Sequence, residues 1–336
     1  MASLLAVTAC AVAAPPTAID DRVVVLAGDL VVTDTTVTVR RAGNETLGDH
    51  APGDLIVARA GDGLLRTIVA VTEHPDGFLV TTAPATLGDA VIDGDVDAQL
   101  ALDDGKADTY GLGRIDVDVG PRTLWSHARF TMTLNHAGLQ ATPKLDLDLA
   151  LRDRNLDQFE AVLHGELDAD LDLDIDARAG TVRPAIPLWR SVPAVFYQQI
   201  GWVPVVETVT LTVGLRFDTT ARGDAHAHLQ GSAHVTLAGG LRYADARFTP
   251  VAEFDHEVAG TLATGTRVDA IDVRAYLYTQ VDVKFYGVAG PFINAGPYVE
   301  ADRVGIHAEA GGALGVFGVN VPLIPHLTLV DESTPL

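Results

Sequence analysis

The stretch Leu-Asp-Ala-Asp-Leu-Asp-Leu-Asp-Ile-Asp-Ala, residues 167–177, indicates the fold class of this chain. Apolar residues and aspartates alternate with a period of two, as does the shorter stretch Leu-Asp-Leu-Asp-Leu-Ala-Leu at residues 145–151. A period of two places one residue set on each face of a β-strand, whereas a helix repeats every 3.6 residues. These stretches therefore predict half-buried strands with a carboxylate-bearing outer face.

Similar alternation and short β-branched runs continue along most of the 336 residues. We therefore expect an all-β protein with a small N-terminal β-barrel-like module and a large antiparallel β-sandwich or elongated β-tube. The expected divisions are a signal segment and tether at 1–19, the module at 20–95 and the large domain at 96–336. Within the large domain, the proline- and aromatic-rich residues 181–206 are expected to form a crossover with a helical turn near 195–200.

The sequence predicts two further local structures in the large domain, one of them with an alternative. Residues 152–155 are expected to form a turn that brings the two aspartate-bearing strands side by side. Residues 156–164 could form a helix capped by Asn155 and ended by Gly165, but the alternation favours a strand.

Composition narrows the possible functions. Hydrophobic residues make up 48% of the chain and charged residues 20%, which allows a sizeable core. The formal net charge is −22, from 45 acidic and 23 basic residues. This charge disfavours nucleic-acid partners, whose phosphates it repels. No later stretch has the 18 or so uninterrupted apolar residues typical of a transmembrane helix.

The N-terminus predicts export. Residues 4–10, Leu-Leu-Ala-Val-Thr-Ala-Cys, resemble the end of a bacterial lipoprotein signal peptide, in which the cysteine is lipidated. Cys10 is the only cysteine, which also excludes an intramolecular disulfide. No Lys or Arg precedes the apolar run, and residues 11–13 offer an Ala-x-Ala site for ordinary secretion instead. The expected locations are the bacterial outer membrane through a lipid anchor, the periplasm or the extracellular space.

The N-terminal module resembles a known barrel. Residues 53–57, 63–71 and 78–83 look like strands of a Hint-type barrel. The chain has neither the Cys or Ser nucleophile at the head of that module nor the His-Asn pair at its end, so the resemblance implies the barrel without self-splicing.

A second resemblance covers most of the chain after residue 50. The same module followed by residues 85–90, together with residues 286–291 and 296–300, is similar to exported bacterial β-rich proteins of no assigned function. This resemblance implies a surface-exposed β protein and supplies no active site.

Histidines suggest one possible metal site. His226 and His228 lie two residues apart and share a face of a strand. A turn at 230–232 would place His234 on the partner strand, and Asp224 lies on the same face. Three such histidines can bind zinc and leave a fourth position for water. The alternative is that all four are surface residues, because Ala225, Ala227 and Leu229 take the core face.

The aspartates suggest a second possible metal site, one for calcium. Crowded carboxylates can supply the six to eight oxygens that calcium takes. The candidate ligands are Asp170, Asp172 and Asp174, with Asp146 and Asp148 on the neighbouring strand. The alternative is a solvated face that also blocks edge-to-edge aggregation. Apart from this calcium, no cofactor is expected.

The crossover carries a candidate contact surface. Its aromatic residues Trp189, Phe196, Tyr197 and Trp202 could either plug one end of the β structure or contact a lipid or protein partner.

These observations favour a non-enzymatic exported protein, lipid-anchored, with a structural, adhesive or binding role. One alternative is a carrier of a lipid or another amphiphile inside the β shell, with residues 182–204 as its mouth. A second alternative is a zinc-dependent hydrolase that uses the His-x-His site.

Overall fold

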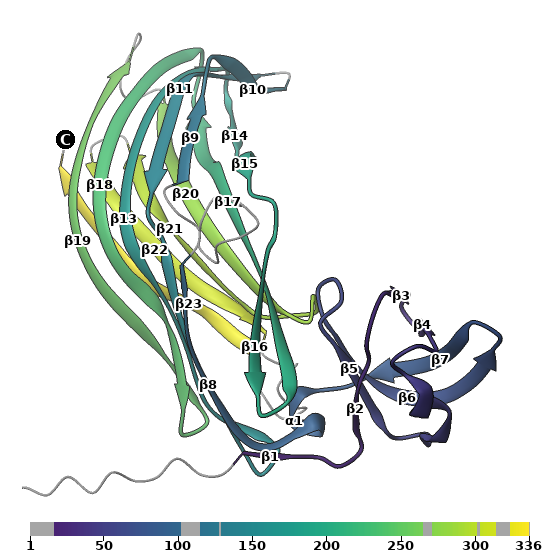
Figure 1. Ribbon diagram of the computed structural model, residues 1–336. Coiled ribbons are helices and arrows are strands. Elements are labelled where there is room, and N and C mark those ends of the chain that lie inside the picture. Colours follow the sequence, from purple (N-terminus) through teal and green to yellow (C-terminus); the bar gives the residue numbers. More distant parts are fainter. Residues whose placement is uncertain are drawn as a thin grey trace, which may run out of the picture.

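The computed structural model describes residues 17–101, 115–127, 129–264, 271–300, 303–313 and 323–335. These residues form two large antiparallel sheets and one smaller sheet, which confirms the all-β prediction. Figure 1 shows a long, curved two-sheet body with the smaller sheet beside one end. Cys10 and the signal segment predicted before it lie outside the described residues.

The nine-stranded sheet is organised around one long strand, β13, which contains the Asp-rich stretch. The β12–β13 turn falls at Asp153 and Arg154, both with positive φ, as a two-residue hairpin loop requires. The predicted turn and the preference for strand over helix at 156–164 are therefore confirmed. The strands of this sheet are β1 (Ala18–Ile19), β8 (Val91–Ala101), β9 (Ile115–Val119), β10 (Arg122–His127), β11 (Phe130–Ala141), β12 (Lys144–Arg152), β13 (Asn155–Ala177), β18 (Ala225–Ala244) and β19 (Arg247–Thr264).

The eight-stranded sheet has long strands and one interrupted edge. Its strands are β14 (Gly180–Val182), β15 (Ala185–Arg190), β16 (Ala194–Ile200), β17 (Val203–Ala221), β20 (Ile271–Phe285), β21 (Pro291–Glu300), β22 (Arg303–Ala313) and β23 (Leu323–Pro335). The first three pair in succession with the same strand, β17, in antiparallel register.

The helical turn predicted near 195–200 is therefore wrong, because those residues form β16. The segment does carry the chain from one large sheet to the other. Pro184 and Pro193 lie in its gaps, which fits a residue that lacks the N–H needed for strand pairing.

The core lies between the two large sheets. Inward-facing Val, Leu, Ile, Ala and Phe side chains from both sheets form one continuous buried cluster. Along one side, β19 packs against β22 and β23. The described strands thus form a sandwich of two hydrogen-bonded sheets, which is the first of the two predicted architectures.

The small module is a six-stranded sheet. Its strands are β2 (Val23–Val25), β3 (Leu30–Val32), β4 (Thr36–Arg40), β5 (Leu55–Ala58), β6 (Leu64–His74) and β7 (Gly77–Pro84). A 3-10 turn at Glu45–Asp49 lies between β4 and β5, and the four-residue helix α1 (Leu87–Ala90) leads into β8. Because β1 and β8 both belong to the large sheet, the module is inserted between its first two strands.

The module is packed firmly against the sandwich. Val23, Leu55, Val57 and Leu65 belong to the same buried cluster as the sandwich core. A second, smaller cluster fills the module itself. Within the described residues, no helix is long and apolar enough to cross a membrane.

Candidate functional site

The candidate histidines lie on one uninterrupted strand. β18 pairs with β13 from Ala225 through Tyr243 without a break, so the turn predicted at 230–232 is wrong. The small residues Gly231 and Ser232 fit the middle of the ladder as readily as a turn. His234 is thus six residues from His228 on the same strand, or about 20 Å at about 3.4 Å per residue.

Each of these histidines faces an aspartate of the Asp-rich stretch. The nitrogen-to-oxygen distances are 2.9 Å for His226–Asp176, 3.0 Å for His228–Asp174 and 2.6 Å for His234–Asp168. Residues directly opposite in an antiparallel pair lie on the same face, which explains the pairing. The predicted histidine set is therefore spread along the sheet as His–Asp pairs.

Two further histidines on neighbouring strands extend this arrangement. His136 of β11 lies 2.7 Å from Asp170, and His164 of β13 lies 3.1 Å from Asp146. We call these five pairs the His–Asp face: His136–Asp170, His164–Asp146, His226–Asp176, His228–Asp174 and His234–Asp168. The hydrogen bond that His234 donates to Asp168 raises the pKa of His234, so that histidine holds its proton more tightly than a free imidazole.

The zinc and calcium predictions stay predictions, but their ligands are not gathered around one point. Asp224 is exposed beyond the end of β18, near His226, and far from His234. Among the residues that the structure describes, no group of three or more His, Cys, Asp or Glu side chains is placed to hold a metal ion.

The predicted neighbour of the Asp-rich stretch is wrong. β11, rather than β12, pairs with residues 167–177, while β12 pairs with the first half of β13. Because β13 is longer than its hairpin partner β12, β11 pairs with the remaining part of the same edge of β13. Asn135, at a bulge in β11, donates hydrogen bonds of 2.8 Å to both Asp172 and Asp174. The bond from Asn135 to Asp174, together with the one from His228, lowers the pKa of Asp174.

Asp148 lies in a different acidic environment. It faces Asp97 on β8 and Glu160 on β13, one on each side. Partial burial and these like charges raise the pKa of Asp148. Asp146 is instead paired with His164. The two predicted calcium ligands on β12 therefore have different neighbours, a histidine for Asp146 and two acids for Asp148.

A shallow hollow lies within the His–Asp face. Its floor includes Gly138, where an added Cβ would lie 2.3 Å from an oxygen of Asp170. The missing side chain at Gly138 therefore leaves room for Asp170 to lean across β11 toward His136. The hollow is lined by Asp116, Asp118, His136, Asp168, Asp170, Ser232, His234 and Glu257, among others.

The predicted aromatic residues lie on the interrupted edge of the eight-stranded sheet. Phe196 is buried and Trp189 is half-buried, and both contribute to the sandwich core. Tyr197 and Trp202 remain 37% and 47% exposed. Only these two are therefore available for contact with a partner.

Sequence reasoning missed a buried acid, Glu207. It lies on the inner face of β17, opposite Phe285 and Phe196, and is 0% exposed. Neither carboxylate oxygen has a hydrogen-bond partner among the described residues. Burial raises the pKa of Glu207 to about 8. The sequence does carry a signal for this buried acid, because Glu207 is a charged residue within the run Val203–Leu211. Both faces of the strand are buried in that run.

A cluster of tyrosines on the outer face of the eight-stranded sheet was also missed. Tyr276, Tyr278 and Tyr298 are buried together although they face outward. Tyr278 and Tyr298 lie over Gly214 and Gly305, where an added Cβ would come within 2.6 Å and 2.8 Å of ring carbons. Two arginines cover the rings through cation–π contacts: Arg216 lies above Tyr276 and Tyr278, and Arg274 lies above Tyr298.

The Tyr276 hydroxyl fixes this cluster to the sheet. It donates toward Asn294 at 2.9 Å and lies 3.1 Å from the carbonyl oxygen of His307. Burial raises the pKa of Tyr276. The cluster thus stabilises this face and leaves little ring surface free.

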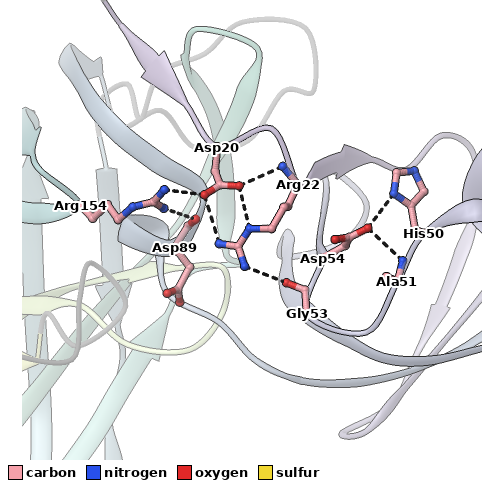
Figure 2. Close-up of polar contacts among 8 residues, drawn as sticks. All are labelled: Asp20, Arg22, His50, Ala51, Gly53, Asp54, Asp89 and Arg154. Carbon is pink, nitrogen blue, oxygen red and sulfur yellow. Dashed lines mark hydrogen bonds and ion pairs between the residues drawn. The ribbon is translucent and has the colours of Figure 1, made fainter.

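A cluster of polar side chains lies at the joint between the module and the sandwich (Figure 2). Asp20 is 4% exposed and accepts hydrogen bonds from Arg22 at 2.9 Å and Arg154 at 2.6 Å. Arg22 also donates to the carbonyl oxygen of Gly53 in the module, and Arg154 to that of Asp89. The hydrogen bonds from the two guanidinium groups hold the pKa of Asp20 far below its usual range. This cluster fixes the module in place.

Comparisons with known proteins found no matching family model, no matching curated protein and no matching solved structure. The resemblances to Hint-type barrels and to exported bacterial β-rich proteins therefore stay predictions.

Proposed function

We propose that this protein is a non-enzymatic exported binding protein, anchored to a bacterial outer membrane through Cys10, that recognises a basic partner through the His–Asp face. The supporting observation is the arrangement of that face. Its ionisable side chains lie in cross-strand pairs along the sheet instead of converging on one reacting centre. Such an arrangement suits recognition over an area better than catalysis at a point.

Charge favours a basic partner. The chain has a formal net charge of −22, and the hollow within the His–Asp face is lined by Asp116, Asp118, Asp168, Asp170 and Glu257. Complementary charge raises both the association rate and the selectivity of an encounter. Hydrogen bonding to Asp168 raises the pKa of His234, and protonation of His234 as the pH falls would reduce the negative charge of the face. Binding should therefore weaken in acid.

The two alternative functions have less support. An amphiphile carrier needs a large apolar cavity, and among the described residues the apolar cavity between Leu171, Leu277 and Val299 measures about 20 Å³, enough for one water. A zinc hydrolase needs its three histidines together, and His234 lies far along β18 from the other two.

The test of recognition is the binding of a fluorescent lysine decapeptide, followed by anisotropy at pH 7.5 and pH 5.5 at constant ionic strength. The Asp168→Asn and Asp170→Asn double variant should weaken binding several-fold at pH 7.5. A matched control, Asp272→Asn with Glu332→Gln, removes the same charge from the eight-stranded sheet. Equal losses in both variants would mean that net charge alone attracts the peptide, and would contradict the proposal.

The test of anchoring is separate. In a bacterial host, the protein should fractionate with outer membranes, and Cys10→Ala should release it into the soluble fraction. Unchanged fractionation of Cys10→Ala would contradict the anchor and leave the recognition test unaffected.

A further inference from the structure

The hairpin between β16 and β17 ends in an unusual residue. Its two-residue turn is Gly201-Trp202, with φ of +59° at Gly201, as expected for the first central position of a type II′ turn. The second position commonly carries a small polar residue, but here Trp202 is 47% exposed. Leaving a large indole in water forgoes the gain of burying it, so the position suggests a partner that covers it.

The first described residues pass directly beside this turn. A Cβ added at Gly201 would lie 3.2 Å from a methyl carbon of Thr17 and 3.4 Å from Ile19. β1, at Ala18–Ile19, is held there by pairing with β8. Figure 1 shows β1 and the tip of the β16–β17 hairpin at the same end of the sandwich. The chain that precedes Thr17 therefore enters the fold next to Trp202.

The length of that preceding chain limits how far an anchor can be. Six residues lie between Cys10 and Thr17, so seven residue-to-residue steps join them. At no more than about 3.6 Å per residue, they span at most about 25 Å. A bilayer that holds a lipid on Cys10 would therefore lie within this distance of the β16–β17 turn.

We propose that Trp202 inserts into the interfacial region of the bilayer to which Cys10 is anchored. The inference rests on the anchoring proposed above and adds the surface that faces the membrane. Indole rings favour the membrane interface because they combine an apolar body with one N–H donor. Tyr197, 37% exposed on the same hairpin, supplies a second amphipathic ring. A contact at this tip would fix which end of the sandwich faces the bilayer, which attachment at Cys10 alone does not.

The test separates this contact from cellular lipidation. Because Cys10 is the only cysteine, the full chain can be coupled to vesicles of zwitterionic phosphatidylcholine that contain a maleimide lipid. Tryptophan emission is then compared with and without brominated phosphatidylcholine, which quenches indoles that reach the bilayer. Trp202→Phe is the test variant, and Trp189→Phe, at a half-buried edge position, is the matched control.

The expected result is quenching of the coupled protein that Trp202→Phe abolishes and Trp189→Phe preserves. Absence of quenching, or quenching that persists in Trp202→Phe, would overturn the membrane contact. Neither result depends on whether cells lipidate Cys10, so a failed anchor and a failed contact are distinguishable.

Discussion

Arg154 and Asp20, 134 residues apart in the sequence, are joined by a hydrogen bond of 2.6 Å. Arg154 occupies the β12–β13 turn of the sandwich, whereas Asp20 lies where the chain leaves β1 for the module. Arg22 reaches the same carboxylate from the other side and also contacts Gly53 of the module. One buried carboxylate thus ties a hairpin turn, the first strand and the module together.

Arg154→Ala should destabilise the protein by about 1–2 kcal/mol, since it removes a charge-assisted bond from a buried carboxylate that keeps a second partner. Urea unfolding at pH 7 measures the change. Arg183→Ala, which removes an exposed ion pair with Asp218, is the control and should change stability by less than about 1 kcal/mol. Equal effects of the two variants would mean that the joint contributes no more than a surface pair.

His234→Gln should reduce the stability gained on acidification. The pKa of His234 is raised in the folded protein, so its contribution is complete below its unfolded value near 6.5 and is lost as the pH rises through the folded value. Melting temperatures at pH 6 and pH 8 test this expectation. His326→Gln is the comparison and should affect the difference less, because His326 lies 4.0 Å from a carboxylate oxygen of Glu309.

Glu207→Gln should flatten the fall in stability between mildly acidic and alkaline pH. The pKa of Glu207 is raised from 4.5 to about 8, so the unfolded chain releases this proton before the folded one does. Below pH 4.5, Glu207 is protonated in both the folded and the unfolded chain and costs no stability. As the pH rises toward 8, the free energy of unfolding falls by up to about 5 kcal/mol.

Denaturant unfolding at pH 5 and pH 8 measures this slope. Glu207→Gln should exceed the parent protein in stability at pH 8 and approach it at pH 5. Glu166→Gln, an exposed change on β13, should leave the slope as it is. A parent protein whose stability does not fall over this range would contradict the buried, protonated state of Glu207.

Asp148→Asn should raise the melting temperature at pH 7, because it relieves repulsion with Asp97 and Glu160 and removes a group whose pKa is raised. Asp146→Asn, two residues away, should not, since Asp146 is paired with His164 at 3.1 Å. The advantage of Asp148→Asn over the parent should shrink as the pH falls through the raised pKa of Asp148. A gain from Asp146→Asn equal to that from Asp148→Asn would show that only overall charge matters.

The period-two pattern by itself determined the all-β class, the Asp-bearing outer face of residues 167–177 and the turn at 152–155. Alternation of apolar and polar residues is a local property, because each side chain reports which face of its own strand is buried. The same local pattern favoured a strand over a helix at 156–164. It also placed His226, His228 and His234 correctly on the polar face.

Only the tertiary structure decided which strands are neighbours. Pairing depends on contacts between distant residues, and periodicity does not encode strand order. For this reason the turn at 230–232 was predicted where β18 continues, and β12 was expected beside Asp-rich residues that β11 in fact accompanies. The pairing of each aspartate with a histidine, the burial of Glu207 between aromatic residues and the joint at Asp20 all follow from that strand order.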